Sequence, residues 1–206
     1  GFSLVPNNNA QRTLILGRAG TEEPVLFTVR EDFSLGSSSN AWGPVNVNAD
    51  WNVLVANGKT LNVYGALNSS GRTITVGGEG FSGTLVLNNA ANASMTAEWV
   101  ITSGSTVRCM NNSALGSGLV TLDGGTLDFN SQTIGSTITL NMSGTGTLQN
   151  VTVDGAILSY TSSSGNDGIT ASNTTWTSGK IDIGRLLQGF SAEGSNTVDL
   201  GAELGE

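Results

Sequence analysis

The chain repeats one short phrase, a Thr followed by an apolar residue, in Lys59-Thr60-Leu61, Gly83-Thr84-Leu85, Ser105-Thr106-Val107, Gly125-Thr126-Leu127 and Gly146-Thr147-Leu148. Successive copies of the Thr are 24, 22, 20 and 21 residues apart. Self-similarity at a period of about twenty residues is typical of a solenoid, in which each repeat is one turn of backbone. A single turn has no core of its own, so it buries its apolar side against the turns above and below it.

A second apolar run precedes each copy of the phrase, and Gly, Asn or Ser separates the runs: 52–55, 73–76, 99–101, 119–122 and 137–140. Short apolar runs separated by these turn-forming residues are typical of strands joined by turns, and helical periodicity is nearly absent. The sequence therefore predicts an all-β chain folded as a right-handed parallel β-helix (β-solenoid) of about seven to nine turns. At about 4.8 Å per turn, we expect a body roughly 35 to 45 Å long.

The apolar residue of each phrase is predicted to point into the solenoid and to form one core ladder: Leu61, Leu85, Val107, Leu127 and Leu148. Trp51 and Trp99 directly precede strand runs, and an interior position is favoured for both over a sugar-stacking platform on the surface. The chain has one cysteine, Cys109, in an apolar phrase. A lone Cys in a strand is most often a small buried hydrophobe.

Residues 1–35 do not follow the repeat and hold most of the early charge. Terminal repeats are usually atypical because they cover the end of the stack, so this segment is predicted to be an N-terminal cap or a docking segment. Its two strand-like runs supply the assembly candidates, which are Thr13, Leu14, Ile15, Leu16, Val25, Leu26 and Phe27.

The solenoid is predicted to span residues 36–206, with a polar loop inserted near 161–177. The spacing from Thr147 to Lys180 is 33 residues, which fits one ordinary turn plus about a dozen inserted residues. Residues 201–206 still resemble repeat material, so we expect that the chain continues or that its last turn meets a neighbour.

The charge pattern excludes several classes of partner. The net charge is −8, there is no His, and the eight Lys and Arg residues are scattered singly. Nothing resembles a nucleic-acid-binding surface, and attraction to an anionic membrane is disfavoured. No apolar run approaches the length of a membrane span. An acidic surface rich in Asn, Ser, Thr and Gly suits a secreted or surface-displayed bacterial protein.

The stretch from Gly104 to Phe129 resembles the autotransporter-associated β-strand repeat. The matching motifs are Ala114-Leu-Gly-Ser-Gly118, Gly124-Gly-Thr-Leu-Asp128 and Ile134-Gly-Ser-Thr-Ile-Thr-Leu140. The resemblance implies a right-handed parallel β-helix that serves as a stalk, or as a segment that assists secretion, in a large surface protein. The family's Asn-Thr-Tyr-x-Gly-Gly-Thr phrase is degraded here to Asn92-Ala-Ser-Met-Thr96.

Parallel β-helices often carry polysaccharide lyases and hydrolases, whose chemistry needs carboxylates stacked on neighbouring turns. Asp123 and Asp128 fall within one repeat, but the residues one turn later, Gly144 and Gln149, are not acidic. Residues 165–168 lack the ligand spacing of a calcium loop. We therefore predict no catalytic, cofactor-binding or metal-binding residue. Paired Thr residues are too sparse for a flat ice-binding face.

The sequence thus predicts a non-enzymatic extracellular scaffold or stalk that assembles head to tail with copies of itself or with neighbouring segments of a longer chain. Assembly would join the first 35 residues of one copy to the last turn of the next, and contacts that do not close generate filaments. Two alternatives stay open: a polysaccharide-degrading β-helix enzyme, and a carbohydrate-binding adhesin module that contacts surface glycans.

Overall fold

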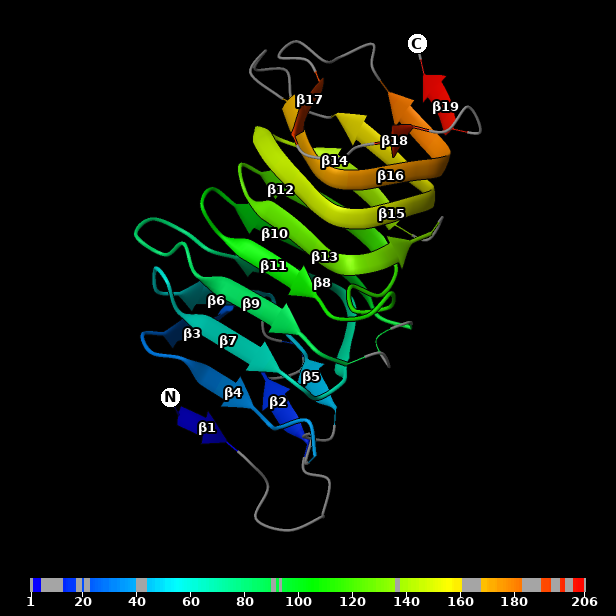
Figure 1. Cartoon of the computed structure of the whole chain (residues 1–206). Helices are drawn as coiled ribbons and strands as arrows, with labels where there is room; N and C mark the ends of the chain where they lie inside the picture. Colours follow the sequence, from blue (N-terminus) through cyan, green and yellow to red (C-terminus); the bar gives the residue numbers. More distant parts are fainter. Residues whose placement is uncertain are drawn as a thin grey trace.

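The computed structural model describes residues 2–4, 13–17, 20, 23–39, 44–89, 92, 94–135, 138–160, 168–182, 190–193, 197–198 and 202–205. Regular structure in this part of the chain is entirely β. Helices are absent from these residues, so none of them forms an apolar helix that could cross a bilayer. The strands are stacked into a column whose first and last strands, β1 and β19, lie at opposite ends (Figure 1).

Nineteen strands are present among the described residues: β1 (Phe2–Leu4), β2 (Leu14–Leu16), β3 (Val25–Val29), β4 (Phe33–Leu35), β5 (Val45–Val47), β6 (Trp51–Val55), β7 (Thr60–Val63), β8 (Leu67–Val76), β9 (Thr84–Leu87), β10 (Thr96–Thr102), β11 (Thr106–Cys109), β12 (Gly118–Asp123), β13 (Thr126–Ile134), β14 (Ile138–Met142), β15 (Thr145–Tyr160), β16 (Gly168–Asp182), β17 (Phe190–Glu193), β18 (Thr197–Val198) and β19 (Ala202–Gly205). Long strands such as β8 and β15 bend around a corner and contribute to more than one side of the column.

Every pairing between these strands is parallel, and the pairings form three stacks. Stack A runs through β1, β4, β7, β9, β11, β13, β15, β16 and β17. Stack B contains β2, β5 and β8, then β13, β15, β16 and β18. Stack C runs through β3, β6, β8, β10, β12, β14, β15, β16 and β19. The chain visits A, B and C in order, so the predicted all-β parallel solenoid is confirmed.

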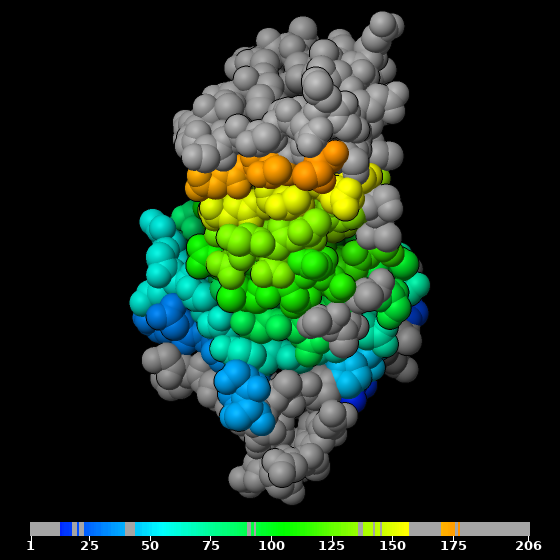
Figure 2. Space-filling view, turned by 45° about the vertical axis from the view of Figure 1, so that its right-hand side comes forward, coloured from blue at the N-terminus to red at the C-terminus, as the bar shows by residue number. Residues whose placement is uncertain are grey.

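The solenoid has about six turns in the part of the chain where side chains are described almost throughout. This number is smaller than the predicted seven to nine turns. The early turns are longer than the period of the repeat, because Phe33 pairs with Leu61 and Leu61 with Leu85. A longer turn uses more residues for the same rise of one strand spacing, so a chain of given length forms fewer turns. Figure 2 shows these turns as successive layers from blue to orange. Backbone pairing continues stack A beyond them, to β1 at one end and to β17 at the other.

Stack A places the five phrases one above another. Thr106 pairs with Thr84 on one side and with Thr126 on the other, and the same column continues to Thr60 and Thr147. Their apolar neighbours form a buried column in the interior, in which Leu61, Leu85, Val107, Leu127 and Leu148 are all fully buried. The alternation follows from strand geometry, since successive side chains point to opposite faces.

Stack C supplies the facing wall of the core. Trp51, Ile74 and Trp99 are stacked in register, and both Trp side chains are buried, as the sequence predicts. The Trp99 indole N–H donates to the carbonyl oxygen of Leu115 at 3.1 Å. The interior is therefore a continuous apolar column between stacks A and C.

Stack B is interrupted in the two turns between β8 and β13, and a side chain bridges the gap. The buried amide of Asn92 accepts from the Leu67 N–H at 2.7 Å and donates to the Ala114 carbonyl at 2.7 Å. A buried backbone group without a partner costs about as much as a lost hydrogen bond. Asn92 satisfies one such group in each neighbouring turn.

Two of the predicted segment boundaries need revision. Strands β1, β2 and β3 pair with β4, β5 and β6, so the described part of residues 1–35 already forms turns of the solenoid. Its role as a cap or docking segment stays a prediction. The inserted loop was predicted too long, because residues 168–177 lie in β16, while 161–167 lie outside the described residues.

The insertion of about a dozen residues was expected from the spacing between Thr147 and Lys180, but these two residues are not paired. Thr147 pairs with Thr170, whereas Lys180 pairs with Ile157 in stack C. The turn from Thr147 to Thr170 therefore spans 23 residues, an ordinary length, and Lys180 lies on a different side of the column.

Leu127→Asp tests the interior ladder. The substitution buries a carboxylate without a partner, and we expect unfolding to be easier by about 4 kcal/mol or more, measured by chemical denaturation. Leu26→Asp is the matched control, because Leu26 is 63% exposed and should tolerate the same change. Equal stability of Leu127→Asp and the parent chain would place Leu127 outside the core.

Candidate functional site

The two acids that the sequence analysis weighed as a catalytic pair lie in different surroundings. Asp123 is exposed at the end of β12, at the corner between stack C and stack A. Asp128 lies in β13, and its side chain is only 3% exposed. As the sequence predicted, the residue paired with Asp128 in the next turn is Gln149, which is not acidic.

Asp128 is the centre of a hydrogen-bonded network that joins neighbouring turns. Its carboxylate accepts from Arg108 Nε at 2.9 Å, from the Asn130 backbone N–H at 2.9 Å and from Asn150 Nδ2 at 3.0 Å. Asn173 then donates to Asn150 Oδ1 at 3.2 Å. The network therefore connects four consecutive turns at one corner.

The corner itself explains why Asn occupies these positions. Asn130, Asn150 and Asn173 have φ values of 49°, 54° and 52°, in the left-handed region. Among residues with a side chain, Asn is one of the few that adopts this conformation readily. The turn of the backbone and the hydrogen-bonded column thus depend on the same residue type.

The electrostatics of Asp128 follow from this network. Burial acts to raise its pKa, but hydrogen bonds from Asn150, the Asn130 N–H and Arg108 outweigh burial and hold the pKa below the usual range. A carboxylate held ionised and fully hydrogen-bonded is a poor general acid. Its geometry is that of a structural tie between turns.

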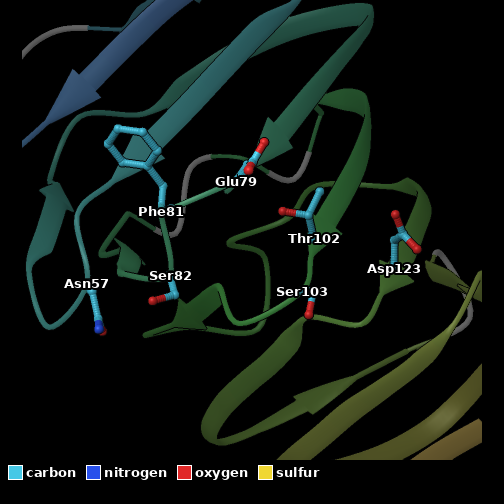
Figure 3. A pocket seen from close by; sticks show the side chains of 9 residues that line it. Asn57, Glu79, Phe81, Ser82, Thr102, Ser103 and Asp123 are labelled. Carbon is cyan, nitrogen blue, oxygen red and sulfur yellow. The ribbon is translucent and has the colours of Figure 1, made fainter.

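An open groove lies at the corner where stack C leads into stack A (Figure 3). It has a volume of about 510 Å³ and is lined by Asn57, Gly78, Glu79, Gly80, Phe81, Ser82, Thr102, Ser103 and Asp123. The connection at residues 77–83 is seven residues long, whereas those at 103–105 and 124–125 have three and two residues. The longer loop therefore overhangs the shorter corners of the following turns.

The loop is fixed to the column at both ends. Gly77 has a φ of 94°, and a Cβ there would collide with the Ser105 side chain, so only Gly fits. The Ser105 hydroxyl donates to the Phe81 carbonyl at 3.0 Å, and the Thr102 hydroxyl donates to the Val76 carbonyl at 3.1 Å. These contacts hold one wall of the groove against the next turn.

Of the residues that line the groove, only Asp123 was weighed as a site residue from the sequence. The signal was the phrase Gly77-Gly-Glu-Gly80, whose extra glycines lengthen one corner. No group of three or more Asp, Glu or Cys residues that could hold a metal ion lies together in the described residues.

Other predicted positions are placed as follows. Cys109 is fully buried, and burial raises the pKa of its thiol. The stretch 165–168 is described only at Gly168, so the prediction that it is not a calcium loop lies outside the described residues.

The assembly candidates lie on β2, β3 and the residue before β2. Ile15 and Leu26 point outward and are 58% and 63% exposed. Leu16 is buried, and Leu14, Val25 and Phe27 pack partly against the core. Thr13 is exposed. Apart from the exposed polar Thr13, the structure thus divides the candidates into an outward apolar pair and a group that belongs to the core.

No protein-family model matches the chain, and no curated protein or solved structure is significantly similar to it. The resemblance to the autotransporter-associated repeat therefore rests on the motif residues alone.

Asp128→Asn tests the structural role of the network. The amide places donors against Arg108 and Asn150, so we expect a loss of about 1–3 kcal/mol of unfolding free energy at pH 7. Because the folded pKa is depressed, the stabilisation is present above the unfolded pKa of about 4 and is lost as the pH falls through the lower folded value. The difference between parent and variant should shrink at acid pH.

Chemical denaturation at several pH values measures this effect, with Asp123→Asn as the control for an exposed carboxylate. A loss in Asp128→Asn that does not depend on pH would contradict the assignment.

Proposed function

We propose that the chain is a non-enzymatic structural scaffold, a stiff stalk or spacer in a secreted or surface-displayed bacterial protein. The observation that carries the proposal is the uninterrupted apolar column, in which Leu61, Leu85, Val107, Leu127 and Leu148 are buried in consecutive turns. Each added turn lengthens the body by about 4.8 Å without changing its cross-section. The motif resemblance to the autotransporter-associated repeat supports the same role.

The use of acidic residues also supports a structural role. Glu31 forms an ion pair with Lys59 at 2.7 Å, and Asp32 accepts from the Thr60 N–H at 2.9 Å. Asp50 accepts from the Thr73 N–H at 3.0 Å. Together with Asp128, these acids contact a residue of an adjacent turn. Their carboxylates are occupied in joining turns and are not stacked in a shared groove.

The first turns carry the features of an association surface. Ile15 and Leu26 are exposed, whereas the residues paired with them in the next turn are Asn46 and Asn52. At these two outward-facing positions the side chain is apolar in the N-terminal turn and polar in the turn that follows it. Ile15 lies in stack B and Leu26 in stack C, and we propose that these two exposed apolar side chains contact another copy of this chain and join copies into longer assemblies.

Analytical ultracentrifugation and electron microscopy of the intact chain test this function. We expect rod-like particles that associate with increasing concentration. Ile15→Lys combined with Leu26→Lys should weaken association about tenfold or more, because two buried contacts are replaced by charges. Asn52→Lys, one turn away, is the matched control and should associate as the parent chain does.

Two results would count against the proposal. A monodisperse chain at high concentration would remove self-association and leave the stalk role. Release of shortened or unsaturated products from a polysaccharide incubated with the pure chain would contradict the non-enzymatic role itself.

A further inference from the structure

The groove below the loop 77–83 differs chemically from the rest of the column. Glu79 and Asp123 contribute two carboxylates, and no Lys or Arg is among the residues that line it. Neither carboxylate takes part in an ion pair within the described residues, whereas Glu31 and Asp128 do. These two acids are therefore not explained by the stacking role that we assign to the others.

The remaining lining groups supply a mixed set of contacts. Asn57 offers an amide, Ser82 and Ser103 offer hydroxyls, and Phe81 offers an aromatic ring. Figure 3 shows that Glu79, Phe81 and Ser82 come from the overhanging loop, while Thr102, Ser103 and Asp123 come from the two following turns. Arg30 stands 6.0 Å from the centroid of the Phe81 ring and packs over it. The ring is thereby held at the rim of the groove.

A volume of about 510 Å³ lies in the range of sites for small ligands, which is about 300–1,000 Å³. Amide, hydroxyl and carboxylate groups beside one aromatic side chain match a ligand with many hydroxyls and an apolar face. Such a ligand is a short oligosaccharide. The two carboxylates form no ion pair within the described residues and outnumber the one cation beside the groove, the Arg30 guanidinium over Phe81, so they favour an ammonium group over an acidic sugar.

We propose that this groove binds a short amino-sugar oligosaccharide. Glu79 and Asp123 accept hydrogen bonds from the ammonium groups, Asn57 and the two Ser hydroxyls bind the sugar hydroxyls, and Phe81 contacts the apolar face of a ring. The groove is open to solvent along one side, so a longer chain of sugars can extend beyond it. The site would attach the scaffold to a glycan without any reaction.

Isothermal titration of the full chain with a β-1,4-linked glucosamine tetramer tests this site. We expect saturable binding that weakens as salt is raised, because exposed charge pairs are screened. Glu79→Gln combined with Asp123→Asn should weaken binding about tenfold, the effect of two exposed charge contacts. Glu98→Gln removes an exposed acid of β10 that does not line the groove and should leave binding unchanged.

Three other probes separate the possible causes of binding. Cellotetraose, which is neutral, should bind more weakly, and tetragalacturonate, which is acidic, should not bind. Spermidine tests whether charge alone suffices, and it should bind more weakly than the sugar. Equal binding of cellotetraose or spermidine, equal loss in Glu98→Gln, or no binding of the amino sugar would overturn the proposal.

Discussion

The structure depends on one constraint, which is that each turn can satisfy its backbone and bury its apolar side only against the turns above and below. Parallel pairing and core burial are therefore a single requirement. Thr106 is paired with Thr84 and Thr126, and this register keeps Val107 directly between Leu85 and Leu127. A slip of one residue would exchange Leu127 and Asp128 between interior and exterior, so the register is strongly specified.

The same constraint decides where the molecule can vary. The strands of stacks A and C keep their register from turn to turn, because any change there would break both the pairing and the core. The corners are free of this demand, and they differ in length between residues 77–83 and 124–125. The groove and the Asp128 network both lie at corners, which is where a solenoid can acquire chemistry without disturbing its column.

Sequence alone predicted the parts of the fold that repeat with the strand period. The Thr-apolar phrase located stack A because the side-chain alternation and the turn length are both present in the sequence. The corner network was missed because it depends on the left-handed conformation of Asn130 and on contacts between turns. Its signal was present, since Asn130, Asn150 and Asn173 stand at near-repeat spacing.

The errors in the prediction arose where two sides of a turn carry similar phrases. Lys180-Ile181 resembles the stack A phrase but belongs to stack C, and pairing it with Thr147 produced an insertion that is absent from β16. The groove could not be predicted from Asp123, because its walls come from four different turns. A repeated phrase locates a strand within a turn. The shape of the corner beside that strand depends on the lengths of the connections in the neighbouring turns.

The register of stack A can be measured directly with pairs of spin labels. Ser34 and Ser172 lie six pairings apart in one outward column, through Asn62, Val86, Arg108, Asp128 and Gln149. At about 4.8 Å per turn, labels at these positions should be about 29 Å apart, and labels at Asn62 and Ser172 about 24 Å apart. Cys109 is buried, so labels react at the introduced cysteines. Distances that increase by one strand spacing per turn are the predicted result, and equal or unordered distances would contradict the parallel column.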